Sequence, residues 1–155
     1  MTIAKNDINY IEERLKLRQI YESVSPRQRL GVIRKRLLED EIGATKLITV
    51  VSAVEGLARC LVVHLKTNDP ANIINVYRTH RKKDPESLVA EFFKLSGIVE
   101  PKHHFTDDTW PLFREAIEFR NLVVHECTYL GQDKYPSLIS STLEVLEEMI
   151  RIGKL

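Results

Sequence analysis

The chain has 155 residues, of which 43% are hydrophobic and 29% are charged, and its formal net charge is +1. This size and composition are typical of one globular domain with a substantial core, and the small net charge excludes a polycation over the whole length. There is no apolar run that we expect to span a bilayer and no signal-peptide core in residues 1–10, so we expect a cytoplasmic protein.

The first predicted elements are two helices with many basic residues. Apolar residues at helical spacing predict the first helix over about residues 7–24, with a partial apolar face. Residues 25–28 (Ser-Pro-Arg-Gln) then supply the N-cap, the proline and the glutamine of a capping box, so a second helix should begin there. Gly43 leaves open whether this helix stops or continues into the next one.

The third predicted helix, over about residues 42–66, is almost entirely apolar, and we expect it to be the centre of the core. Glu55 is an acidic residue that departs from this apolar pattern. One interpretation pairs Glu55 with Arg59, one turn away, at the edge of the apolar face. The other places Glu55 opposite Arg120 of a later helix, where its carboxylate would balance the guanidinium. Both interpretations remain open at this point.

The remaining helices are marked by their start and stop signals. Asp69-Pro70 and Asp84-Pro85 each predict a helix start, a long helix should cover about residues 109–129, and the last helix should run from Pro136 to Gly153. No segment has the pattern of a strand. We predict an all-α, up-and-down bundle of four or five main helices in a single domain, with residues 41–155 as the core bundle and residues 1–40 as a basic helical extension.

Cysteines and histidines give no sign of a metal site. Cys60 and Cys127 lie far apart in apolar helical stretches, which predicts two reduced and packed thiols. The five histidines and two cysteines have no spacing that suits zinc, and the chain lacks a glycine-rich phosphate loop. We therefore predict neither a metal nor a cofactor.

Positive charge is concentrated early in the chain. Between Arg14 and Arg36 there are eight Lys or Arg residues and one acidic residue, Glu22. Arg34, Lys35 and Arg36 form the densest group and are the candidate RNA-binding residues, although a charge run on a helix is more often a solvated face. A second basic group surrounds His80 and consists of Arg78, Arg81, Lys82 and Lys83.

The most informative stretch is residues 120–125, Arg-Asn-Leu-Val-Val-His, near the end of the long helix. Arg120 falls on the apolar face, so its guanidinium needs an anionic partner, a cleft or a second subunit. Asn121 lies one turn before His125 and can orient its imidazole. At 100° per residue Arg120 points about 140° away from His125, so spacing alone does not place both side chains in one site.

This Arg-Asn-x-x-x-His pattern resembles the motif of the HEPN family (higher eukaryotes and prokaryotes nucleotide-binding domains). Its context is also similar to that family, because the motif lies in a small all-helical chain after a long helix that contains Ser52-Ala53-Val54-Glu55. The resemblance implies a helical bundle in which Arg120, Asn121 and His125 are the catalytic residues. Glu55 is similar to an acidic position of the preceding helix in some HEPN families. The resemblance also implies a homodimer whose two motif helices face each other across a shared cleft.

RNA cleavage without a metal ion is the chemistry that suits these residues. An imidazole can take the proton of a ribose 2′-hydroxyl or protonate the leaving oxygen, and a guanidinium can bind the phosphate and stabilise its growing charge. We predict a metal-independent endoribonuclease with His125 as general acid or base and Arg120 as the phosphate ligand. The alternative is a non-catalytic HEPN-like module that binds RNA, a nucleotide or a protein partner and only dimerises.

The resemblance suggests a toxin, stress or phage-defence setting, with a protein antitoxin or regulator as a further partner. In the toxin branch paired with nucleotidyltransferase antitoxins, a tyrosine commonly stands two residues after the histidine and receives the inhibitory modification. This chain has Cys127 at that position, and the nearest tyrosine is Tyr129. It therefore departs from the pattern of that branch.

Overall fold

The computed structural model describes residues 9–155, which form helices and contain no strand, so the predicted all-α fold is confirmed for this part of the chain. The predicted start of the first helix at residue 7 lies outside the described residues. The elements in chain order are α1 (Tyr10–Ser23), α2 (Pro26–Leu37), α3 (Gly43–Lys66), α4 (Pro70–Thr79), α5 (Pro85–Leu95), the short α6 (Pro101–His104), α7 (Thr109–Glu126), the 3-10 turn η2 (Gln132–Lys134) and α8 (Tyr135–Gly153).

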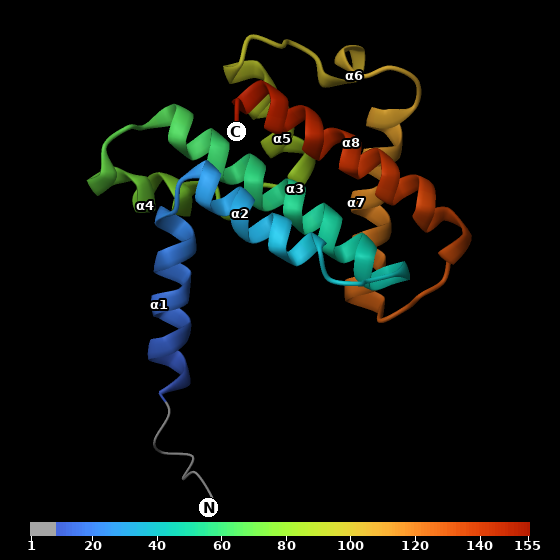
Figure 1. Ribbon diagram of the computed structural model, residues 1–155, viewed down its shortest axis with the longest axis horizontal. Coiled ribbons are helices and arrows are strands. Elements are labelled where there is room, and N and C mark those ends of the chain that lie inside the picture. Colours follow the sequence, from blue (N-terminus) through green and yellow to red (C-terminus); the bar gives the residue numbers. More distant parts are fainter. Residues whose placement is uncertain (1–8) are drawn as a thin grey trace, which may run out of the picture.

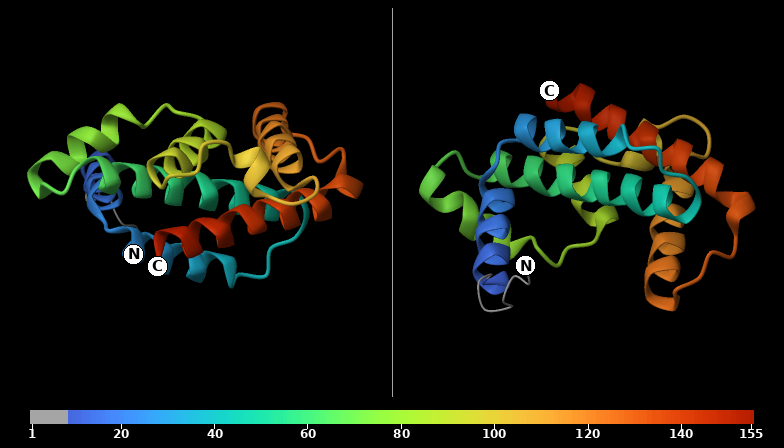
Figure 2. Two further views of the ribbon diagram at one scale, coloured as in Figure 1. Left: turned by 90° about the horizontal axis from the view of Figure 1, so that it is seen from above. Right: turned by 60° about the horizontal axis from the view of Figure 1, so that its bottom comes forward.

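Helix α3 is the central helix, and α2, α4, α5, α7 and α8 all pack against it. Figures 1 and 2 show that α2, α3 and α8 share one general direction, whereas α1 and α7 run steeply across it. Helix α1 packs against α4 and projects away from the rest of the domain (Figure 1). The helices are therefore not all aligned along one bundle axis.

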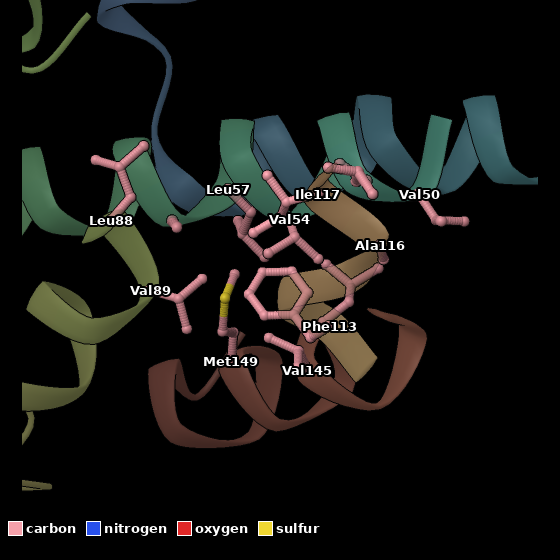
Figure 3. Close-up of a cluster of buried hydrophobic side chains, with 14 of the residues drawn as sticks. Val50, Val54, Leu57, Leu88, Val89, Phe113, Ala116, Ile117, Val145 and Met149 are labelled. Atoms are coloured by element: carbon pink, nitrogen blue, oxygen red, sulfur yellow. The ribbon is translucent and has the colours of Figure 1, made fainter. Parts of the chain in front are cut away.

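The core lies where α3, α5, α7 and α8 meet. Figure 3 shows the ring of Phe113 from α7 between Val54 and Leu57 of α3 on one side and Val145 and Met149 of α8 on the other. All five side chains are almost completely removed from solvent. Full burial of an aliphatic or aromatic side chain contributes about 1.5–3 kcal/mol, so this cluster fixes α7 against the α3 layer.

Local capping decides where several helices begin. The Ser25 hydroxyl accepts a hydrogen bond from the Gln28 amide, and the Gln28 side chain accepts one from the Ser25 amide, which confirms the predicted capping box. Asp69 and Asp84 cap α4 and α5 by accepting a hydrogen bond from the backbone amides of Ala71 and Ser87, and each is followed by a proline in the first turn. A cap of this kind contributes about 1 kcal/mol.

Two residues with a left-handed backbone conformation, Gly43 and Cys127, mark helix boundaries that differ from the sequence prediction or that it did not decide. Gly43 has φ +61°, a conformation that side chains disfavour, so α2 and α3 are separate helices. Cys127 has φ +51° and ends α7 at Glu126, three residues before the predicted end. The first helix also differs from expectation, because Glu22 is its one buried residue and its apolar residues Ile11, Leu15 and Ile20 face solvent.

Two predictions about α3 and the cysteines need correction. Contrary to the sequence analysis, α3 is long and apolar enough to cross a membrane, but most of it is buried inside the domain, as in the core helix of a soluble protein. Cys60 packs in the interior, and burial raises the pKa of its thiol to about 11. Cys127 is exposed, so the expectation that both thiols are packed is wrong for Cys127.

Candidate functional site

The motif occupies the last turns of α7, where the helix leaves the core. Ala116, Ile117 and Val123 are buried, whereas Val124 is 52% exposed. His125 on the next position is exposed as well. The motif therefore lies where the buried part of α7 gives way to a solvent-facing end.

The Arg120 guanidinium has the anionic partner that its apolar surroundings require. Its side chain is only 15% exposed, and its Nη2 lies 3.5 Å from Oε1 of Glu55 on α3. Its Nε donates a hydrogen bond to Oδ1 of Asn121 at 3.0 Å. Because leaving such a charge unpaired costs several kcal/mol, Glu55 is a main reason that an arginine is tolerated here.

Glu55 serves both of the pairings that the sequence left open. Its Oε2 lies 3.4 Å from Nη2 of Arg59, one turn along α3, while its Oε1 faces Arg120. Arg59 is largely buried and also donates hydrogen bonds to the backbone carbonyls of His80, Arg81 and Lys83. A single carboxylate thus joins the α7 motif to the turn after α4.

His125 stands apart from this ion-pair group. Within residues 9–155 its imidazole has no hydrogen-bond partner, and the amide oxygen of Asn121 is used by Arg120. The orienting contact between Asn121 and His125 that the spacing allowed is therefore not formed. An exposed imidazole without internal bonds keeps both ring nitrogens available for proton transfer.

A groove of about 670 Å³ runs beside the motif helix, between α7 and the start of α5. Asn121 is the one motif residue that lines it. Its charged lining residues are mostly acidic, namely Asp84, Glu86, Glu115 and Glu118, and its one arginine, Arg114, is paired with Glu86 at 3.0 Å. The excess of carboxylates in this groove repels phosphate. The described part of the chain has no cluster of His, Cys, Asp or Glu that suits a metal ion.

The predicted RNA-binding residues Arg34, Lys35 and Arg36 lie in the last turn of α2 and are exposed. The charge of Arg36 is offset, because its Nη1 lies 2.5 Å from Glu39 and 3.2 Å from Glu41. Arg34 and Lys35 make no ion pair within residues 9–155. The RNA-binding role of this group stays a prediction.

The structure also gathers arginines at a place that the sequence did not single out. Arg14 and Arg18 of α1 line a pocket of about 400 Å³ together with Arg29 of α2, Arg59 of α3 and Arg81 after α4. The first three belong to the basic run already noted, and Arg81 belongs to the group around His80. Their convergence depends on how four helices pack, which no local spacing reveals.

No family model, curated protein or solved structure matches the chain. The resemblance to the HEPN family therefore depends on the motif residues and their helical context alone.

Proposed function

We propose that the protein is a metal-independent endoribonuclease of HEPN type that acts at Arg120, Asn121 and His125. The observation that carries the proposal is the contrast between the two charged motif residues. Arg120 is held in place by Glu55 and Asn121, whereas His125 is exposed and makes no hydrogen bond within the described residues. A positioned guanidinium with a proton-transfer group on the same helix end suits phosphodiester cleavage.

In the proposed reaction the ribose 2′-oxygen attacks the adjacent phosphorus while the bond from phosphorus to the 5′-oxygen breaks. An imidazole of His125 takes the 2′-proton, and the leaving 5′-oxygen receives a proton from water or from a second His125. The products are a 2′,3′-cyclic phosphate and a free 5′-hydroxyl. Arg120 stabilises the charge on the non-bridging oxygens, which requires its guanidinium to turn partly from Glu55 toward the phosphate.

Incubation of the purified protein with single-stranded RNA in a metal chelator tests this function. We expect fragments that carry cyclic-phosphate ends. Wild-type protein that binds many RNAs without cutting any of them would contradict the proposal.

A specific observation favours a second candidate, a non-catalytic module that binds RNA, a nucleotide or a protein partner. Arg120 already has a carboxylate partner, and the groove beside Asn121 is lined mainly by acidic residues. If the pairing of Arg120 with Glu55 is purely structural, no phosphate reaches the guanidinium. RNA binding without cleavage is the result expected from this second candidate.

We further propose that the protein forms a homodimer through the exposed end of α7. Large apolar side chains gather there beside His125: Leu122, Val124, Tyr129 and Leu130 are all exposed. Such a patch marks an interaction site in a folded protein. Pairing two copies of this end would cover the patch and bring two His125 side chains toward one cleft. A protein antitoxin or regulator is a further proposed partner for the same surface.

We expect light scattering to give the mass of a dimer at micromolar concentration. Replacing Leu122 and Val124 by glutamate should give a monomer, because burying two new carboxylates in the interface costs several kcal/mol. Leu95→Glu is the matched control, since Leu95 is similarly exposed on α5 and its replacement should leave the dimer intact. A wild-type monomer would remove the shared-cleft arrangement.

A further inference from the structure

The arginine pocket between α1, α2, α3 and the turn after α4 is a strongly charged hollow. Its five arginines (Arg14, Arg18, Arg29, Arg59 and Arg81) face a single carboxylate, Glu22, so the charged lining residues carry a formal +4. The pocket has a volume of about 400 Å³ and is lined by residues of α1, including Arg14 and Arg18. An excess of guanidinium groups of this kind attracts a polyanion.

Internal bonds hold the inner arginines in place and leave N–H groups free. Arg29 donates from Nη2 to the Tyr77 hydroxyl at 2.7 Å, while its Nε is buried and has no hydrogen-bond partner within residues 9–155. Glu22 is only 2% exposed, and its Oε2 accepts from Arg78 and Arg81 while its buried Oε1 accepts nothing from the described residues. One buried donor of the pocket, Nε of Arg29, and one buried acceptor, Oε1 of Glu22, therefore have no partner among the described residues.

Helix α1 extends the pocket as a stripe in which two arginines lie between two tyrosines. Tyr10, Arg14, Arg18 and Tyr21 recur at intervals of three or four residues and so share one face of the helix. Tyr10 and Tyr21 are 71% and 40% exposed as whole residues, and Cζ of the Arg29 guanidinium lies 5.2 Å from the centre of the Tyr21 ring. Arginines that hold phosphates beside rings that stack on bases are the common design of single-strand binding surfaces.

We propose that the arginine pocket and this stripe bind single-stranded RNA, with the arginines on its phosphates and Tyr21 against a base. The inference deepens the proposed function and rests on it for the choice of ligand. A strand fits better than a lone phosphate, because the stripe continues along α1 from Arg14, at the pocket, to Tyr10, which lies outside it. The carboxylate of Glu55 contacts Arg59 of the pocket and Arg120 of the motif, so one side chain links the two groups of residues.

The test measures binding of a fluorescent, fully 2′-O-methylated RNA oligonucleotide, which cannot be cleaved because its 2′-oxygens cannot attack. Arg14 and Arg18 are exposed, so their joint replacement by alanine should leave the fold intact. We expect this double variant to lose affinity about tenfold or more and to reduce the slope of log affinity against log salt by about 1.4, or about 0.7 for each lost phosphate contact. The matched control is the double alanine variant of Lys94 and Lys102, two exposed lysines of α5 and α6 that do not line the pocket; it removes the same charge and should lose less.

Replacement of Tyr21 separates stacking from charge. Tyr21→Ala should weaken binding of the same oligonucleotide about tenfold, whereas Tyr21→Phe keeps a ring and should retain wild-type affinity. Melting curves of both variants verify that the domain remains folded. Equal affinity of the alanine and phenylalanine variants would show that no base stacks on this ring.

Two results would overturn the pocket as an RNA site: equal losses in the two double variants, or wild-type affinity after loss of Arg14 and Arg18. Failure of the proposed function is a separate result. Binding of uncleavable RNA through the pocket, without cleavage of ordinary RNA, would contradict the nuclease and leave the pocket standing. Cleavage of ordinary RNA at the wild-type rate by the pocket variants would support the nuclease and contradict the pocket as its RNA site.

Discussion

We expect His125→Ala to lower the rate of metal-independent RNA cleavage by about 10²- to 10⁴-fold, which is the usual contribution of general acid–base catalysis. The substitution is informative because His125 is exposed and makes no hydrogen bond within the described residues. Surface substitutions of this kind usually change the free energy of unfolding by less than about 0.5 kcal/mol. A loss of cleavage can therefore be assigned to the missing imidazole and not to unfolding.

His103→Ala is the matched control for this experiment. His103 is also an exposed histidine, but it lies in α6 beside Glu100 and is not part of the motif. This variant should cleave RNA at the wild-type rate and leave the same cyclic-phosphate ends. Cleavage that persists at the wild-type rate in His125→Ala would point to another site or to a contaminating nuclease.

Helix boundaries could be predicted where they depend on neighbouring residues. The capping box at Ser25 and the Asp-Pro starts at Asp69 and Asp84 form from bonds within four residues, so the sequence alone contains the necessary information. The steep course of α1 and α7 across α3 is different. It follows from side chains that pack between distant segments, such as Phe113 against Val54, and no local pattern specifies it.

The candidate site was predictable to a similar extent. An arginine among apolar residues of a helix requires a counter-charge, and the position of Glu55 on the central helix made it a candidate partner. The sequence offered the pairings with Arg59 and with Arg120 as alternatives and could not show that one carboxylate serves both. The arginine pocket was hidden for the same reason, since Arg14, Arg59 and Arg81 come together through the contacts of α1, α3 and α4.

Glu55 should be the site of the second large effect, measured as a loss of stability. Its side chain is 27% exposed and contacts two guanidiniums whose side chains are only 9% and 15% exposed, those of Arg59 and Arg120. We expect Glu55→Ala to lower the free energy of unfolding by about 1–3 kcal/mol, because it leaves partly buried charged donors without their acceptor. Urea titration measures this loss, and Glu147→Ala, at an exposed acidic position of α8, should stay near wild type.

A double-mutant cycle then separates the two partners of Glu55. Arg120→Leu places an aliphatic side chain on the apolar face of α7, so in this background Glu55 has only Arg59 to balance. If Arg120 accounts for most of the effect, Glu55→Ala should cost much less in the Arg120→Leu protein than in wild type, with a coupling energy of about 0.5–3 kcal/mol. An equal cost in both backgrounds would mean that Glu55 stabilises Arg59 alone and that the guanidinium of Arg120 is free to hold a phosphate without losing a structural ion pair.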